Sequence, residues 1–213
     1  MNIINKIISA FSKNDTNEPP AKIHFLPWVG DRYSKATKKV LVLGESHYCA
    51  NLSDDKPTLT QEVINDFISP NTVWEPYKNT YTKFTRALAG YEVPREEVKD
   101  IWEYIIFYNY VQVPITGPRV APTPKQFMQS EGAFWRVVDM YQPDYIIAWG
   151  KRLFHNMPSK YSNAMPLVVN FEPVRIKTYK RNGRNIKVMQ MTHPSAGYSW
   201  RFWHKAIEKL FEI

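Results

Sequence analysis

The chain has 213 residues, of which 44% are hydrophobic and 15% aromatic. This composition excludes a disordered chain, and the length suits one domain with a full core rather than two domains. The formal net charge of +8 favours a polyanionic partner, nucleic acid before an anionic membrane surface, because basic side chains that neutralise phosphates release counterions. The single cysteine, Cys49, excludes an internal disulfide and indicates a reducing, cytoplasmic location.

Residues 1–21 are expected to form a short helix and a linker that precede the domain. Apolar residues at positions 3, 4, 7, 8 and 11 follow helical spacing, and the turn-forming residues after them, including Pro19 and Pro20, indicate the linker. This helix is too short and too polar for a signal peptide or a membrane span, so no membrane partner is expected. Residues 22–213 are expected to form a single α/β domain.

Four apolar segments predict buried strands, because short continuous apolar runs bounded by turn residues are typical of parallel sheets. They are Val40–Leu43, Tyr104–Gln112, Asp144–Gly150 and Lys187–Thr192. Helical patterns occupy residues 58–67, 80–88, 94–98, 124–141, 151–157 and 200–211. The alternation predicts an α/β fold, a three-layer αβα arrangement around a central, mostly parallel four-stranded sheet. Asn182 and Gly183, within a basic segment, predict the turn of a hairpin.

Polar residues follow three of the predicted strands. Glu45 to Tyr48 follow the first strand, Asn109 ends the second, and His193-Pro194-Ser195 follows the last. Each has a simpler structural explanation when taken alone: a turn before proline, a strand-end hydrogen bond, or a carboxylate at a helix start. Because the carboxyl ends of parallel strands share one edge of a sheet, their combination predicts a ligand cleft there.

This ordered set resembles the uracil-DNA glycosylase superfamily, from about Phe25 to the C-terminus. The matching motifs are Gly44-Glu45-Ser46-His47-Tyr48, Asn109 and His193-Pro194-Ser195, and residues 119–125 and 144–150 are similar to the middle of family members. The resemblance implies a glycosylase-like fold and a monomer that binds duplex or single-stranded DNA. It also implies that a uracil or modified pyrimidine is flipped out and its N-glycosidic bond hydrolysed, which leaves an abasic site. The setting would be DNA repair or defence against modified phage DNA.

The resemblance also implies roles for individual residues. Glu45 would orient water and offset positive charge on the sugar, while His193 would donate to the departing base. The implied base-binding residues include an Asn, whose amide matches a pyrimidine edge: Gly44, Ser46, His47, Tyr48 and Asn109. The implied DNA-binding residues are Arg119, Lys125, Pro194, Ser195, Tyr198, Trp200 and Arg201. The aromatic ring that stacks on the base would be Tyr48, Phe25, Trp28, Trp74 or Tyr77.

The chain departs from the family pattern at two positions. Ser46 stands where the most active uracil enzymes carry Asp, and His47 stands where they carry Pro, so a modified pyrimidine becomes an alternative substrate. Relatives with Gly-Glu at this point often bear an iron-sulfur cluster on four cysteines, which a chain with Cys49 alone cannot hold. We therefore expect no cluster, no other metal and no cofactor.

Two other functions stay open. A non-catalytic nucleic-acid-binding relative is suggested by the missing Asp and the positive charge. A GDSL-like serine hydrolase, with Ser46 as its nucleophile, is less favoured. Gln190 occupies the place of the Asp that would orient the catalytic His, and Tyr48 replaces the last glycine of a nucleophile elbow.

Overall fold

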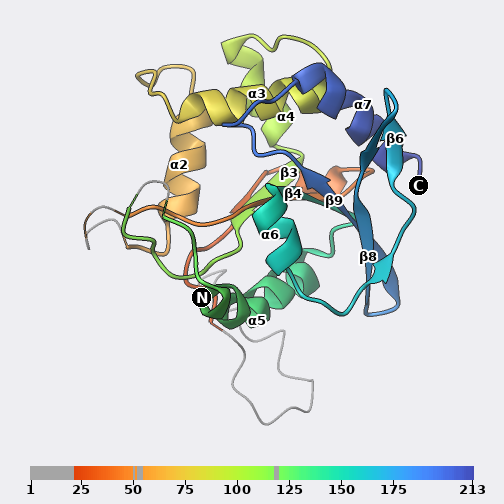
Figure 1. Ribbon diagram of the computed structural model, residues 1–213. Coiled ribbons are helices and arrows are strands. Elements are labelled where there is room, and N and C mark those ends of the chain that lie inside the picture. The colour runs from red at the N-terminus through yellow and green to blue at the C-terminus, as the bar shows by residue number, and fades with distance from the viewer. Residues whose placement is uncertain (1–21, 50, 52–54, 118–119) are drawn as a thin grey trace.

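The computed structural model describes residues 22–49, 51, 55–117 and 120–213 (Figure 1). The expected N-terminal helix and linker lie outside these residues. The strands are β1 (Trp28–Val29), β2 (Val40–Gly44), β3 (Ile105–Asn109), β4 (Tyr145–Trp149), β5 (Ser162–Asn163), β6 (Leu167–Val169), β7 (Glu172–Val174), β8 (Ile176–Arg181) and β9 (Arg184–Met191). The helices are α2 (Leu59–Ile68), α3 (Lys78–Ala89), α4 (Val98–Trp102), α5 (Pro124–Tyr141), α6 (Lys151–Asn156) and α7 (Trp200–Phe211).

The central sheet has seven strands in the order β1-β3-β2-β4-β9-β8-β5, where four were expected. The four expected strands, β3, β2, β4 and β9, are its parallel middle. The other three pair antiparallel: β1 lies beside β3 at one edge, and β8 followed by β5 lies beyond β9 at the other. Strands β1 and β5 were missed because they have two residues each. Strand β8 was implied by the predicted hairpin but not counted in the sheet, because Ile176 and Tyr179 are its only apolar residues. Strands β6 and β7 form a separate two-stranded sheet.

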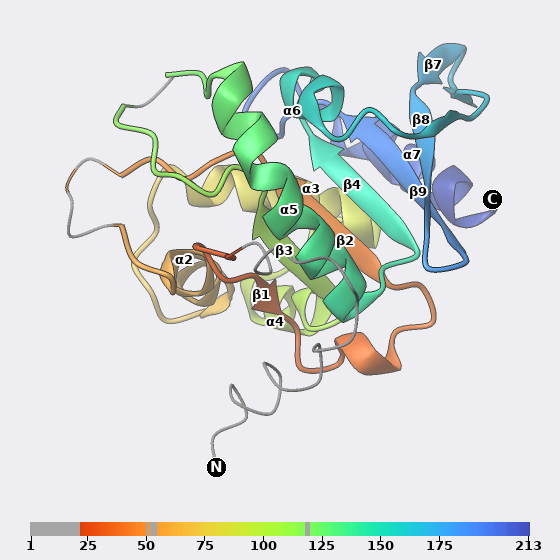
Figure 2. The same ribbon diagram turned by 90° about the horizontal axis from the view of Figure 1, so that it is seen from below.

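Helices cover both faces of the sheet, as the three-layer prediction requires. In β2, Val40 and Val42 face one core and Leu41 and Leu43 face the other, so both sides of the strand are buried. Helices α2, α3, α4 and α7 supply the first core, and α3, α4 and α7 lie above the sheet in Figure 1. Helices α5 and α6 supply the second core and lie in front of the sheet in Figure 2. The protein is thus a mixed α/β structure with a mostly parallel central sheet.

Local sequence explains where several elements begin and end. Helix α5 begins with a capping box, in which Thr123 and Gln126 satisfy each other's backbone N–H groups and Pro124 takes the first helical position. Asn182 and Gly183 have φ angles of 49° and 74°, which the tight turn of the β8–β9 hairpin requires and which confirm the predicted turn. In the described residues, no helix is both long and apolar enough to cross a membrane.

The order of the parallel strands determines where a ligand is expected. The chain passes from β2 to β3 on one side and then crosses to β4 on the other side of β2. The connections that leave β2 and β4 therefore diverge, and such a reversal is where open α/β sheets usually bind ligands. Glu45 follows β2 and Gly150 follows β4, so these two connections border the expected position.

Candidate functional site

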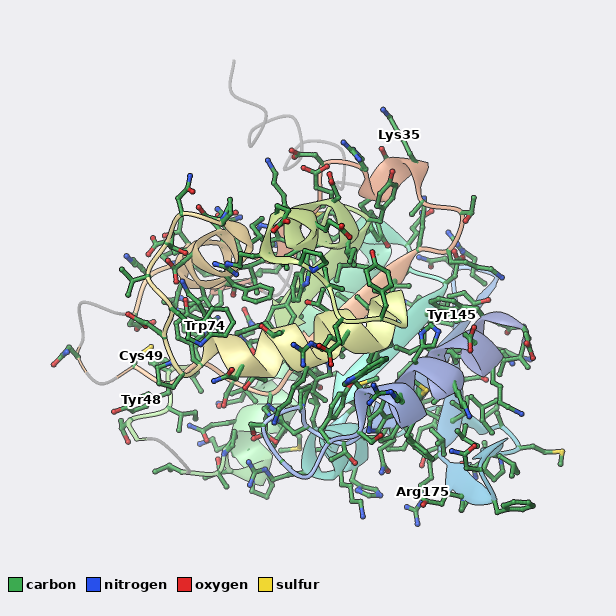
Figure 3. The ribbon with its side chains drawn as sticks, turned by 90° about the horizontal axis from the view of Figure 1, so that it is seen from above. Lys35, Tyr48, Cys49, Trp74, Tyr145 and Arg175 are labelled. Carbon is green, nitrogen blue, oxygen red and sulfur yellow. The ribbon has the colours of Figure 1, made fainter. Side chains whose placement is uncertain are left out.

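The four parallel strands end at one edge of the sheet, as the sequence predicted. The register pairs Gly44 with Asn109, and Trp149 with Met191, so the loops after these strands lie side by side. Figure 3 shows Tyr48 at this end of the molecule, while Tyr145, the first residue of β4, lies toward the opposite end. Two separate side-chain clusters occupy this edge.

The first cluster contains an ion pair between Glu45 and Arg152. Arg152 Nε donates to Glu45 Oε2 over 2.8 Å, and Nη2 donates to Oε1, so one guanidinium engages both carboxylate oxygens. The Glu45 side chain is only 15% exposed, whereas that of Arg152 is 52% exposed. The pair raises the pKa of Arg152, mainly through the hydrogen bond with Glu45. Arg152 thus covers the more deeply placed carboxylate.

His193 follows β9, near enough to this ion pair for both of its charges to act on the pKa of the ring, and the ring has a defined proton position. Its Nδ1 accepts the backbone N–H of Ser195 over 3.2 Å and is 2.7 Å from the Ser195 hydroxyl oxygen. The proton of the neutral ring is therefore on Nε2. Burial lowers the pKa of His193, Glu45 opposes this shift and Arg152 adds to it, so both charged groups act on the ring. The ring is neutral near pH 7 and can donate from Nε2.

A tight turn brings the end of β4 against the end of β9. Gly150 has φ 102°, and its N–H donates to Met191 O over 2.7 Å. A Cβ placed on Gly150 would lie 3.9 Å from His193 Cβ. Glycine at this position tolerates the positive φ angle, and the turn places Arg152 beside the first connection of the sheet.

The second cluster consists of His47, Asn109 and Thr60. Asn109 Nδ2 donates to His47 Nε2 over 3.0 Å, and the Thr60 hydroxyl is 2.7 Å from the same nitrogen. Since an amide NH₂ can only donate, Nε2 is the unprotonated nitrogen. Burial lowers the pKa of His47 to about 4, so its ring is neutral at physiological pH.

Gly44 allows the second cluster to form. A Cβ at this position would lie 2.2 Å from Asn109 Oδ1 and 2.9 Å from Phe107 Cζ. Only glycine leaves room for the amide to approach the backbone so closely. Asn109 itself is 5% exposed. Its amide NH₂ is turned toward His47 rather than toward solvent.

The remaining residues expected to bind a base are differently placed. Tyr48 is half-exposed, and its backbone forms an isolated bridge with Ile115. Ser46 is partly exposed. Within the described part of the chain, no hydrogen bond joins its hydroxyl to an imidazole; His47 Nε2 instead contacts Asn109 and Thr60, and His193 Nδ1 contacts Ser195. The geometry expected of a serine nucleophile and its histidine base is therefore not formed in this structure.

Of the residues expected to bind DNA, some are free at the surface and others are packed. Arg119 lies outside the described residues. Lys125, Ser195 and Arg201 are exposed, and Pro194 is buried. The two aromatic residues are partly buried against the core: Tyr198 stacks on Trp203 at 6.2 Å, and Trp200 lies under the Arg201 guanidinium at 4.3 Å.

The aromatic residues that were expected to stack on the flipped base differ in their solvent exposure. Phe25 is fully buried and meets the His47 ring edge-on at 4.8 Å, and Trp28 is also buried. Trp74 is 48% exposed and lies 5.4 Å from the Arg95 guanidinium. Figure 3 shows Trp74 and Tyr48 at the same end of the molecule. Tyr77 is partly exposed, and its hydroxyl donates to Asp66. Trp74 and Tyr48 are thus the most exposed of the five candidates.

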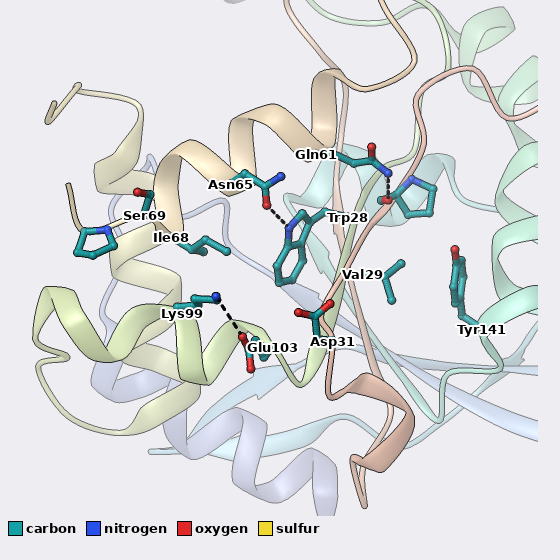
Figure 4. A pocket seen from close by; sticks show the side chains of 12 residues that line it. Trp28, Val29, Asp31, Gln61, Asn65, Ile68, Ser69, Lys99, Glu103 and Tyr141 are labelled. Carbon is teal, nitrogen blue, oxygen red and sulfur yellow. Dashed lines mark hydrogen bonds and ion pairs between the residues drawn. The ribbon is translucent and has the colours of Figure 1, made fainter. Parts of the chain in front are cut away.

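A cavity of about 590 Å³ lies elsewhere, beside the edge strand β1 (Figure 4). Trp28 Nε1 donates to Asn65 Oδ1 over 2.8 Å on one wall, and Glu103 lies on another. The cavity shares no lining residue with either cluster. The carboxylates of Asp31 and Glu103 line this cavity, but no histidine does, whereas the strand ends supply both Glu45 and His193. We therefore take the strand ends as the candidate site.

The sequence missed Arg152 and Thr60 as members of the site. The position of Arg152 could have identified it, because Gly150-Lys151-Arg152 directly follows a predicted parallel strand, and the end of that strand was not examined for site residues. No sequence signal marked Thr60, since it lies in the first turn of α2 and reaches His47 only through the fold.

Among the described residues, no group of three or more His, Cys, Asp or Glu side chains is arranged to hold a metal ion. Comparison of the sequence with models of protein families found no match, and comparison with curated proteins also found none.

Proposed function

We propose that this protein is a DNA glycosylase that hydrolyses the N-glycosidic bond of a uracil or modified pyrimidine. One observation carries the proposal: the Glu45 carboxylate and the neutral His193 imidazole stand at the carboxyl ends of β2 and β9, near enough that the charge of Glu45 acts on the pKa of the ring. These are the two groups that the chemistry needs. The positive charge of the chain and the resemblance of the motifs supply the substrate class.

In the proposed reaction the bond between C1′ and the base nitrogen breaks, and its electron pair leaves with the base. His193 donates a hydrogen bond from Nε2 to a base oxygen and stabilises the anion that forms. A neutral donor suits this role, because it lowers the energy of the departing anion without having to lose a proton. Glu45 offsets the positive charge on the sugar and directs water to C1′, and the proton of the water leaves to the carboxylate or to solvent.

His47 provides a reason to test bases other than uracil. It stands where the uracil enzymes carry Pro, and its ring holds the amide of Asn109, the residue proposed to read the base. A base-reading amide whose orientation depends on a neighbouring imidazole presents its donor and acceptor differently from one that is free. We therefore propose a modified pyrimidine alongside uracil as the substrate.

A second candidate function is DNA binding without catalysis. The observation that favours it is the ion pair itself, because Arg152 donates to both oxygens of Glu45 and so makes the carboxylate a weaker acceptor for a proton from water. Such a protein would bind the nucleic acid but not cleave a glycosidic bond.

A panel of labelled DNA strands tests the two functions. Each strand, single or in duplex, carries one uracil or one modified pyrimidine, and heating in alkali after incubation reveals abasic sites. Glu45→Gln and His193→Asn should abolish scission. Glu62→Gln and His204→Asn are the matched controls, because both residues lie outside the candidate site. Glu62 forms a surface ion pair with Lys56, and the His204 ring of α7 is hydrogen-bonded to the backbone oxygen of Ala87 in α3.

Each result has a distinct meaning. Scission that survives in both site variants would overturn the assigned roles. Binding that depends on salt, with no scission of any base, would leave the non-catalytic function. Hydrolysis of a nitrophenyl ester that is lost in Ser46→Ala would replace both with a serine hydrolase.

A further inference from the structure

We propose that Arg152 is a phosphate-binding residue of this site, and that a backbone phosphate of the substrate releases Glu45 by taking the guanidinium from it. The inference rests on the proposed function, since it assigns the contact that makes the catalytic carboxylate available. It resolves the conflict between a carboxylate needed for chemistry and an ion pair that engages both of its oxygens and covers it from solvent.

The geometry of the pair suits an exchange of partners. The planar guanidinium presents two N–H groups in parallel, and this fork matches a phosphate as well as it matches a carboxylate. Arg152 is the more exposed partner, with 52% of its side chain accessible against 15% for Glu45. A phosphate can therefore reach the guanidinium from solvent, whereas Glu45 is reached only once the guanidinium has moved.

The energy of the pair also permits the exchange. Fully exposed ion pairs contribute only about 0–1 kcal/mol; Glu45 is largely covered, but the half-exposed guanidinium would exchange one bidentate anion contact for another of the same kind. A DNA phosphate brings a second gain, since each contact releases condensed counterions. The phosphate can thus compete with Glu45, even though Glu45 is already in place.

The charges near Arg152 favour an anion. The sequence has no Asp or Glu between Asp144 and Glu172, while it carries Lys151, Arg152 and Lys160 in that interval. Lys151 is exposed beside Arg152. The segment that carries Arg152 is therefore basic, and Glu45 is the carboxylate with which Arg152 forms its ion pair.

The proposal predicts opposite effects of the two partners on DNA binding. Arg152→Gln should weaken binding and reduce the slope of log affinity against log salt by about 0.9 for duplex DNA, the value for one lost phosphate contact. Glu45→Gln should tighten binding by up to about fivefold, because a neutral amide competes less well for the guanidinium. The double variant should bind like Arg152→Gln, because the gain acts through Arg152.

Fluorescence anisotropy with a labelled duplex, measured over a series of salt concentrations, provides these values. The matched control is Arg32→Gln, because Arg32 Nε is 3.0 Å from Glu103 Oε2 in a similar ion pair at the other end of the strands. Arg32→Gln should change the slope and the affinity only through the loss of one positive charge. Lys35→Gln removes one positive charge at another exposed position before β2 and therefore measures that effect separately.

The inference would be overturned if Arg152→Gln and Arg32→Gln had the same DNA affinity and the same slope of log affinity against log salt. This holds even if the protein excises bases. So would a Glu45→Gln variant that binds DNA no better than the wild type. These binding measurements do not need cleavage. If no base in the panel is excised, the glycosylase proposal fails while the phosphate site is still supported or refuted by the slopes.

Discussion

Replacing His47 with glutamine should remove a large part of the acid sensitivity of the fold. Glutamine places its Oε1 near the position of the imidazole Nε2, so it can still accept from Asn109 and Thr60. It cannot take up a proton. The substitution therefore keeps the hydrogen bonds of the second cluster and removes only the titration.

The magnitude follows from the pKa of the ring. Burial lowers the pKa of His47 from 6.5 to about 4. Between these values the unfolded chain binds a proton that the folded protein does not, so the contribution of His47 to stability is complete above 6.5 and falls as the pH drops toward 4. From about pH 7 to about pH 5 the free energy of unfolding should fall by roughly 2 kcal/mol through this residue alone.

Urea unfolding of the wild type and of His47→Gln at both pH values measures this difference. Other groups titrate in the same range, but they do so in both proteins and cancel in the comparison. The wild type should lose about 2 kcal/mol more than the variant. Equal losses in the two proteins would refute the claim that the ring is held neutral by burial.

Three further predictions concern other parts of the fold. Gly44→Ala should lower the free energy of unfolding by about 1–3 kcal/mol, because its methyl would lie 2.2 Å from Asn109 Oδ1; the control Gly197→Ala meets nothing within 4 Å, and equal urea midpoints would contradict the reasoning. Thr123→Ala should cost about 1 kcal/mol in a thermal melt by removing the cap of α5, and an unchanged melting temperature would show that the cap does not stabilise the helix. Burial lowers the pKa of Lys177 from 10.5 to about 7, so wild-type stability should rise with pH between these values, and Lys177→Met should flatten that rise; parallel curves would count against it.

The parallel middle of the sheet was predictable because its strands are buried on both faces. Val40–Gly44 and Tyr145–Trp149 are continuous apolar runs, and burial on two sides requires such runs. The edges were not predictable in this way. Strand β8 contains Lys177, whose stem and ammonium group are enclosed by the rings of Phe154, Tyr161 and Tyr179. A lysine in such a cage looks like a surface residue in the sequence.

The sequence predicted where in the sheet the candidate site lies, but not which side chains contact one another there. Parallel strand ends share an edge, so Glu45 and His193 were expected together from chain order alone. Side-chain partners depend on rotamers and on helices that arrive from distant sequence. Thus Asn109 was expected to face a base, and in the structure it faces His47. Its proposed role in reading the base stays a prediction.

The two-residue strands at both ends of the sheet have a consequence for the protein in concentrated solution. An exposed strand edge is a template on which a second molecule can add its own strand, and long edges of this kind lead to aggregation. Here β1 and β5 each offer a neighbour only two residues to pair with. A strand that adds to β1 or β5 therefore gains few hydrogen bonds, which makes extension of the sheet from these two strands unfavourable.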